Sequence, residues 1–274
     1  MQIDDLLRRV ESLPPLPRTI ILIEEYRRKS EKEISELHDI ISKDALIVTN
    51  LLKIANSAMF GFRSKVETPI RAISLLGINF TISVAISASS QKLLVTTLAP
   101  YGLTNDNFMN SSNIASVLAS LWLGKIDETI KDEIILPALL IDIGKYIIAD
   151  MILNEQKEKE FKAKIEEGIL SIEEVEKEFL GFSSSYVTAQ IFKHWKLSPN
   201  LINSIEFVDD INSVSKEFER KAKILSVIKT VANIKEPLSE KSIKEGIIKA
   251  KEYGFDTKIL AQTIENLKTK IDLY

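Results

Sequence analysis

The spacing of apolar residues constrains the fold of this chain more than any other feature. Apolar positions recur every three or four residues, as at Ile3, Leu6, Leu7 and Val10, and this spacing places them on one face of a helix. No segment alternates apolar and polar residues between hairpin turns, and only nine glycines are present, so β-strands are not expected. The sequence therefore predicts an all-α fold.

Short helices joined by short turns are expected in the N-terminal part. The proline-rich turn at 13–17 ends the first helix, because proline cannot continue one. Asp44 is suited to cap the N-terminus of an apolar helix that ends near Asn56, and Pro69 suits the first turn of another helix. These residues define where the helices begin and end.

Longer helices are expected beyond a turn at 101–105. We therefore expect two parts, an N-terminal helical bundle over 1–105 and a second helical domain over 106–274. No low-complexity linker separates them, so their junction is expected to be packed. The helices of the second part are expected at 107–124, 130–152, 155–168, 171–180, 184–195, 198–207, 215–234 and 239–273, the last with a break at Gly254.

Composition excludes several classes of function. The chain has no cysteine, which excludes disulfides and thiolate sites and suits a reducing compartment such as the cytoplasm; the first residues also lack the apolar core of a secretory signal. A net charge of −3 with interleaved lysine and glutamate argues against nucleic-acid binding. The segment Ala72–Gln91 is uncharged and long enough to span a bilayer, but its many polar residues favour a buried helix pair without membrane insertion.

Four motifs occur in a fixed order along the chain. They are LPPLP at 13–17, IISKDALIVTNLLKIANSAMFG at 40–61, IRAISLLGI at 70–78 and LLIDIGKYII at 139–148. Together they resemble the HDOD family, the HD-related output domains of bacterial signalling proteins, over about residues 5–235. The resemblance implies a multi-helical HD-like core and a cytoplasmic role in bacterial signal transduction. Related domains are often fused to receiver or cyclic-dinucleotide-handling domains; this chain has no room for one, so we expect separate protein partners.

The resemblance also permits a comparison with HD-type phosphohydrolases, which hold metal ions with His and Asp side chains from several helices. Asp142 is the only ligand that clearly survives, so we expect no metal, no cofactor and no catalytic residue. Asp142 is expected to pair with Lys145, Ile141 is expected to fill the former cavity by packing, and His38 and His194 are interpreted as ordinary polar residues. The positions that match the metal ligands are Ser111, Ile141, Asp142, Ser184, Val208, Asp209 and Asn233.

A candidate interaction surface follows the apolar helix of the second motif. Asn56 and Ser57 are expected to cap the end of this helix. They are also candidates for a partner surface with Phe60, Phe62 and Arg63, because aromatic residues and arginine are enriched at interface anchors.

The sequence favours a non-catalytic signalling module that binds another protein or a small regulatory ligand. One alternative is a residual phosphohydrolase, in which Asp142 and Asp209, with Asp210 as a further ligand, would hold Mg²⁺ or Mn²⁺. A second alternative is a sensor that binds a nucleotide without cleaving it. No glycine-rich phosphate-binding loop or zinc-protease motif is present.

Overall fold

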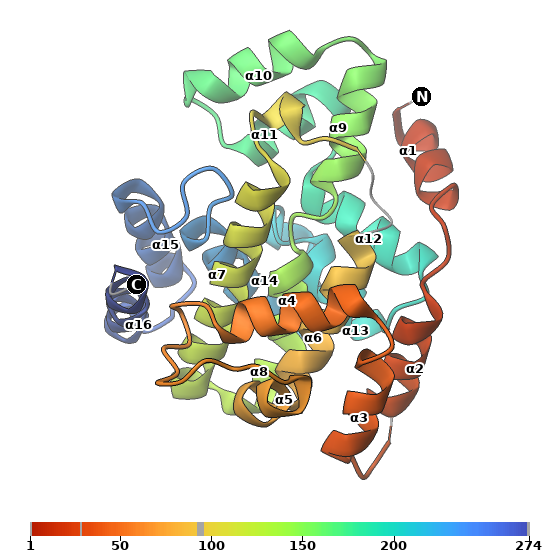
Figure 1. Ribbon diagram of the computed structural model, residues 1–274. Coiled ribbons are helices and arrows are strands. Elements are labelled where there is room, and N and C mark those ends of the chain that lie inside the picture. The colour runs from red at the N-terminus through yellow and green to blue at the C-terminus, as the bar shows by residue number, and fades with distance from the viewer. Residues whose placement is uncertain (1, 28, 92–95, 273–274) are drawn as a thin grey trace.

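The computed structural model describes residues 2–27, 29–91 and 96–272, and within these ranges it contains helices and no strands (Figure 1). The predicted all-α fold is confirmed. The N-terminal part contains α1 (Gln2–Glu11), α2 (Arg18–Arg27), α3 (Ile34–Ile41), α4 (Ala45–Ala55), α5 (Pro69–Leu76) and α6 (Ile78–Gln91). After the short 3₁₀ helix η1 (Ala99–Tyr101) come α7 (Asn105–Ile126), α8 (Glu128–Leu140), α9 (Lys145–Asn154), α10 (Glu158–Glu167), α11 (Ile172–Leu180), α12 (Ser184–His194), α13 (Pro199–Glu206), η2 (Ile211–Ser213), α14 (Lys216–Val231), α15 (Glu240–Glu252) and α16 (Thr257–Asp272).

Local sequence signals set the ends of the N-terminal helices. The side chain of Asp44 accepts hydrogen bonds from two backbone amides in the first turn of α4, as a capping residue does. Thr68 caps α5 in the same way, and Pro69 occupies its first turn. Gly77, with φ of 87°, separates α5 from α6, so the uncharged segment 72–91 folds as two helices. Within the described ranges, no helix has the length and apolar character needed to span a bilayer.

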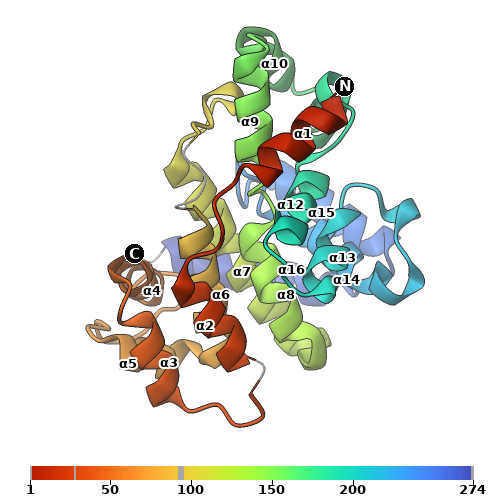
Figure 2. The ribbon, with the colours of Figure 1, turned by 90° about the vertical axis from the view of Figure 1, so that its right-hand side faces the viewer.

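The centre of the molecule is the helix pair α7 and α8, which are joined through Asp127 and pack against each other along their length. α6, α13 and α14 pack against α8, while α14 and α16 pack against α7. The first helix, α1, lies beside α9 and α12 (Figure 2). The boundary predicted near residue 105 stays a prediction.

The LLIDIGKYII motif contains a helix break that was not predicted from the sequence. A single helix over 130–152 was expected, but α8 ends at Leu140, residues 141–144 form a turn, and α9 begins at Lys145. The hydroxyl oxygen of Thr188 on α12 accepts a hydrogen bond from the Gly144 amide at 3.0 Å and lies 3.2 Å from the carbonyl oxygen of Ile141. α12 therefore binds the backbone groups that the break leaves free.

Gly144 allows this close approach of the turn to α12. A Cβ atom at position 144 would overlap the carbonyl oxygen of Ser184 and would lie 2.8 Å from the backbone nitrogen of Thr188. Real Cβ atoms do not approach backbone atoms so closely, so any larger residue must push α12 away from the turn.

We predict that Gly144→Ala lowers the free energy of unfolding by about 1–3 kcal/mol, the usual cost of overpacking. Gly124→Ala is the matched control, because Gly124 is an exposed residue of α7 with nothing within 4 Å of the added methyl group. Alanine favours a helix over glycine by about 0.5–1 kcal/mol, so the control is expected to be stabilised. Urea denaturation measures both values, and equal effects of the two substitutions would contradict the proposed close contact.

Candidate functional site

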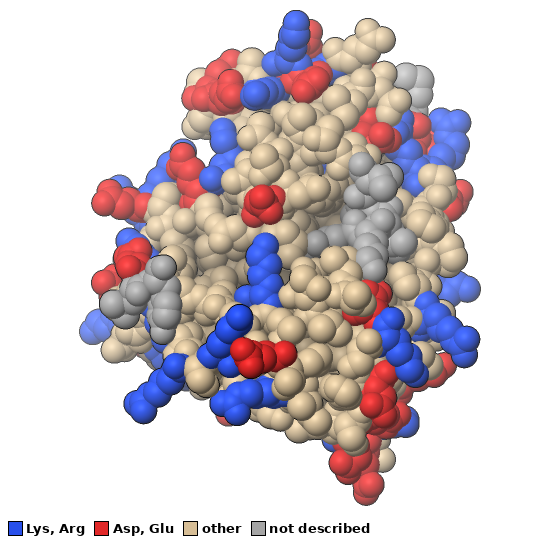
Figure 3. Space-filling view, viewed as in Figure 1, with Lys and Arg blue, Asp and Glu red and all other residues tan. Residues whose placement is uncertain are grey.

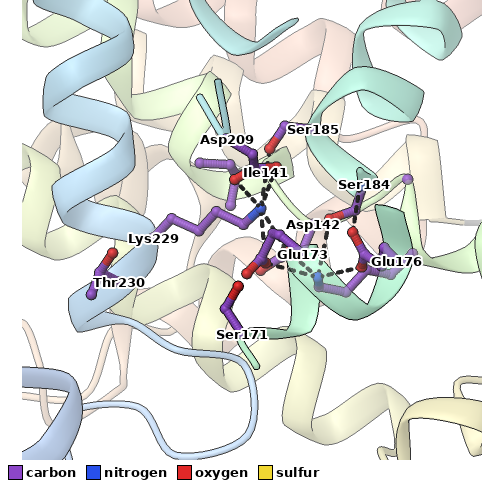
Figure 4. Close-up of polar contacts among 12 residues, drawn as sticks. Ile141, Asp142, Ser171, Glu173, Glu176, Ser184, Ser185, Asp209, Lys229 and Thr230 are labelled. Carbon is purple, nitrogen blue, oxygen red and sulfur yellow. Dashed lines mark hydrogen bonds and ion pairs between the residues drawn. The ribbon is translucent and has the colours of Figure 1, made fainter. Parts of the chain in front are cut away.

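One fully buried lysine, one partly buried lysine and four carboxylates meet beside the LLIDIGKYII turn (Figure 4). They come from the 141–144 turn, α9, α11, α14 and the segment that follows α13. We call this group the charge cluster; its members are Asp142, Lys145, Glu173, Glu176, Asp209 and Lys229.

Lys145 is fully buried, and its ammonium group is surrounded by oxygen atoms. Its Nζ atom lies 2.8 Å from Glu176 Oε1 and 3.2 Å from Glu173 Oε1. It lies 3.2 Å from Asp142 Oδ1 and donates a hydrogen bond to Ser184 Oγ at 3.0 Å. The predicted pairing of Asp142 with Lys145 is confirmed, although Asp142 lies in the turn and not on the same helix.

Lys229 enters the charge cluster from α14, as Figure 4 shows. Its Nζ atom lies 2.9 Å and 3.0 Å from the two carboxylate oxygens of Asp209 and 3.0 Å from Glu173 Oε1. It donates a hydrogen bond to Ser185 Oγ at 3.1 Å and lies 3.9 Å from Asp142 Oδ1. Asp142 and Glu173 therefore each face both ammonium groups.

Glu176 carries further hydrogen bonds at the inner end of the charge cluster. Its carboxylate accepts bonds from the hydroxyl of Tyr101 at 2.9 Å and from the Ser184 amide at 2.6 Å. The ring of Tyr101 also lies 5.3 Å from the ammonium of Lys145, within the range of a cation–π contact. These contacts join η1, α9, α11 and the start of α12.

The pKa values of the cluster follow from burial and from the neighbouring charges. Burial alone would lower the pKa of Lys145, but the carboxylates of Asp142, Glu176 and Glu173 outweigh it and raise that pKa well above its usual value. Burial opposes ionisation of Glu173 too, yet Lys229 and Lys145 hold its pKa below the usual 4.5. Burial, together with the charge of Glu173, raises the pKa of Glu176. The pKa values of the two glutamates on α11 are therefore shifted in opposite directions, down for Glu173 and up for Glu176.

Three of the positions matched to metal ligands lie in or against the charge cluster. Asp142 is buried, with 4% of its surface exposed, Asp209 binds Lys229, and Ser184 binds Lys145. Ile141 and Val208 are buried beside it. Ile141 is the last residue before Asp142, and its carbonyl oxygen faces Thr188.

The remaining candidate residues have other partners. The hydroxyl of Ser111 donates to the carbonyl of Ala232, just after the end of α14, at 2.5 Å. Asn233 accepts hydrogen bonds from the two amides that follow it in the next turn, and Asp210 accepts one from the hydroxyl of Ser213 at 2.6 Å. These residues support local turns and helix ends.

The two histidines lie outside the charge cluster. His38 is beside Asp39, with a contact of 3.2 Å. His194 ends α12, and its Nε2 atom lies 3.1 Å from the carbonyl oxygen of Leu13. This contact helps to hold the proline-rich turn, and Trp195 donates a second bond to the next carbonyl, that of Pro14.

An open cleft of about 950 Å³ lies over the charge cluster, between α11 and the C-terminal helices α14 and α15. Asp142, Glu173, Asp209 and Lys229 reach its wall. Ile141 is buried and does not line this cleft, so the expectation that it fills the former metal cavity by packing stays a prediction. Lys249 of α15 also lines the cleft.

Glu173, Glu176 and Lys229 were not predicted from the sequence. A signal was present for two of them. Glu176 lies one turn after Ile172 on the apolar face of α11, and Lys229 lies one turn after Leu225 on the apolar face of α14. A charged residue within an apolar stripe requires a buried partner, but the spacing alone does not reveal which residue that partner is.

The donor set of the charge cluster does not fit a divalent metal ion. Such an ion requires carboxylate or imidazole groups that are free to bind it, whereas here each carboxylate already faces at least one ammonium group. The cluster contains no imidazole. Across the residues that the structure describes, no three His, Asp or Glu side chains are placed to hold a metal ion.

Comparison with known proteins assigns the family. The HDOD domain model matches residues 13–211, most of the chain, and the chain belongs to the HDOD family. The resemblance predicted from the four motifs is confirmed. One curated relative is an uncharacterised protein of Treponema pallidum (strain Nichols), 27% identical over 89 residues, which make up 32% of this chain and only 17% of that protein.

Solved structures share the fold along nearly the whole chain. A virulence factor of Campylobacter jejuni is 27% identical, with 98% of this chain and 100% of that one covered and a TM-score of 0.57. A protein of Shewanella amazonensis, named as a proposed phosphohydrolase, is 20% identical, with 97% of both chains covered and a TM-score of 0.70. A protein of Marinobacter aquaeolei, named as a proposed signal transduction protein, is 18% identical, with 99% of this chain and 63% of that one covered and a TM-score of 0.71.

We predict that Lys145→Met lowers the free energy of unfolding by roughly 3–5 kcal/mol, because it leaves buried carboxylates without their cation. Lys157→Met is the matched control, since Lys157 pairs with Glu155 at the surface, and such pairs contribute little to stability. Urea denaturation of both variants measures the difference. A cost for Lys145→Met as small as that of the control would contradict the assignment of Lys145 as the central cation.

The opposite pKa shifts of Glu173 and Glu176 predict opposite effects on acid stability. The folded-state pKa of Glu173 is lowered, so its stabilising contribution is present above pH 4.5 and is lost as the pH falls through the lower folded-state value. The raised pKa of Glu176 has the reverse effect, because the folded state takes up its proton first. Between about pH 5 and pH 3, stability should fall less steeply in Glu173→Gln than in the unmodified protein. In Glu176→Gln, stability should fall more steeply than in the unmodified protein as the pH is lowered toward 4.5 from above. Urea denaturation over both pH ranges tests the two signs, and parallel profiles would contradict them.

Proposed function

We propose that this HDOD protein is a non-catalytic module of bacterial signal transduction, located in the cytoplasm, that binds a partner protein or a small regulatory ligand. One observation carries the proposal: the carboxylates at the degenerate HD site surround the ammonium groups of Lys145 and Lys229. A hydrolytic metal ion activates water through an open coordination position. An ammonium group has no such position and only donates hydrogen bonds, so it stabilises the fold without activating water.

The residual phosphohydrolase alternative has less support. It needs Asp142, Asp209 and Asp210 as metal ligands, but Asp142 and Asp209 face lysines and Asp210 binds Ser213. The name of the Shewanella amazonensis structure suggests hydrolysis, whereas that of the Marinobacter aquaeolei structure suggests signal transduction. The absence of cysteine from the chain suits the proposed cytoplasmic location.

The cleft favours a small anionic ligand, which includes the nucleotide-sensor alternative. The ammonium of Lys249 donates a hydrogen bond to the hydroxyl of Thr230 at 2.8 Å. Burial lowers the pKa of Lys249, and the charges of Glu173 and Asp209 offset this only in part. Among the described residues, no carboxylate lies within ion-pair distance of Lys249. A phosphate or carboxylate group of a ligand would supply the missing partner.

Metal content tests the proposal directly. The tag-free protein is offered Mn²⁺, Fe²⁺, Ni²⁺ and Zn²⁺, and bound metal is measured by elemental mass spectrometry alongside assays with phosphomonoester and phosphodiester substrates. We expect metal far below one ion per chain and no turnover. Near-stoichiometric metal that is lost in Asp142→Ala, together with hydrolysis, would overturn the proposal.

A lysine variant tests whether the ammonium group of Lys229 takes the place of a metal ion. Lys229→Met removes the cation from Asp209 and leaves the carboxylates of Glu173 and Asp142 facing the cleft. We expect Mn²⁺ to raise the melting temperature of this variant but not that of the unmodified protein, because a ligand stabilises only the state that binds it. Equal responses of the two proteins would show that Lys229 does not take the place of a metal ion. A nucleotide that raises the melting temperature of the unmodified protein, but not of Lys249→Met, would support the small-ligand form of the proposal.

A further inference from the structure

A second hollow lies on the N-terminal part of the molecule, where α4 ends and the loop 57–68 begins. It has a volume of about 530 Å³, and we call it the α4 groove. Its apolar side chains are Leu52, Ala55 and Phe62, and its charged side chains are Lys53, Arg63 and Lys65. Leu52 and Phe62 are only partly buried, so they leave apolar surface for a partner.

The α4 groove differs in charge from the rest of the protein. Lys53, Arg63 and Lys65 are exposed, and no Asp or Glu lines the groove. Among the described residues, none of these three cations has a carboxylate within ion-pair distance. Figure 3 shows lysine and arginine side chains gathered over α4 and the loop after it, with few acidic ones among them. The chain as a whole carries −3, so this positive surface is local.

Side-chain hydrogen bonds hold the loop in place against the end of α4. The Asn56 amide nitrogen donates to the carbonyl of Val66 at 2.8 Å, and the Asn56 oxygen accepts from the amide of Val66 at 2.8 Å. Val66 is buried. The same Asn56 nitrogen lies 2.8 Å from the carbonyl oxygen of Leu52, and the hydroxyl of Ser57 donates to Ile54 at 2.7 Å. Two carbonyl groups at this helix end, those of Leu52 and Ile54, therefore accept side-chain hydrogen bonds.

Aromatic contacts fix the other wall of the groove. Phe60 stacks on Phe62 with ring centres 5.8 Å apart, and it meets Phe80 of α6 edge-to-face at 5.3 Å. Gly61, with φ of 60°, makes the turn between the two stacked rings. The ring of Phe62 is thus held at the groove before any partner binds, which reduces the entropic cost of binding.

We propose that the α4 groove binds an acidic peptide segment of a partner protein, with one apolar side chain of the segment against Leu52 and Phe62 and its carboxylates against Lys53, Arg63 and Lys65. This inference rests on the proposed function, because it names the kind of partner that the signalling module binds. Of the residues first considered for this surface, Phe62 and Arg63 contact the segment, while Asn56, Ser57 and Phe60 hold the groove in shape.

Charge and shape favour an acidic protein segment over a nucleic acid. Nucleic-acid binding relies on many phosphate contacts and on an extended basic surface, whereas the groove offers three cations on a protein of net charge −3. Apolar anchors beside a small number of charges match the centre and rim of a protein interface.

Peptide selection tests the proposal even though the partner protein is unidentified. A random peptide display library is selected on the full chain, and the affinities of the selected peptides are measured by fluorescence anisotropy at several salt concentrations. The test variants are Arg63→Glu with Lys65→Glu, and Phe62→Ala. Lys241→Glu with Lys244→Glu on α15 is the matched control, with the same change in net charge at exposed positions outside the groove. Melting curves confirm that every variant is folded.

We expect the selected peptides to be rich in Asp and Glu around a Leu or aromatic residue. Their binding should weaken at least about tenfold in each test variant, as for interface anchors, stay unchanged in the control, and weaken as salt is added. Failure to select peptides, selection without acidic enrichment, or binding that survives both test variants would overturn the proposal.

Two further probes test whether the α4 groove binds a nucleic acid or an anionic membrane surface and not an acidic peptide. Single-stranded oligo(dT) and phosphatidylglycerol vesicles are tested with the same variants, and binding of either that is lost in the Arg63→Glu, Lys65→Glu variant would reassign the groove to that polyanion. None of these results depends on the metal and hydrolysis measurements. A catalytic chain would overturn the proposed function alone, and a groove without peptide binding would overturn this inference alone.

Discussion

The buried pairing of Lys145 with the carboxylates of Asp142, Glu173 and Glu176 is the interaction on which the C-terminal part of the structure depends. A charge inside a protein is tolerated only when it is paired and hydrogen-bonded, so each of these groups requires the others to be in position. Lys229 on α14 must likewise be paired, and its partners are Glu173 and Asp209, the latter in the segment after α13. The elements around the charge cluster are therefore fixed relative to one another by electrostatics as well as by apolar packing.

The charge cluster differs from a metal site in the cations that its carboxylates contact. In a metal site, carboxylates and imidazoles converge on an ion that can be removed. In this HDOD protein, carboxylates converge on cations that are covalently part of the chain. We propose that the charge cluster stabilises the fold and does not catalyse hydrolysis. The cleft above it and the α4 groove remain open for binding.

Much of the fold could be predicted from the sequence, because its signals are local. Asp44, Thr68 and Pro69 determine where helices begin, through bonds within one turn. The pairing of Asp142 with Lys145 was also predictable, since the two residues are only three positions apart. The helix break after Leu140 was not, because Gly144 and Ile141 are stabilised by Thr188 on another helix. The open cleft escaped prediction too, because it depends on where α14 and α15 lie.

The sequence by itself determined that the chain is all-α, that it resembles the HDOD family, and that five of the seven positions matched to metal ligands carry neither His nor Asp. Only the tertiary structure decided what holds Asp142. Glu173, Glu176 and Lys229 come from α11 and α14, far from the LLIDIGKYII turn in sequence. Helical periodicity records which face of a helix is buried, but not which other helix it meets. The partners of a buried charge are therefore set by the packing of whole helices.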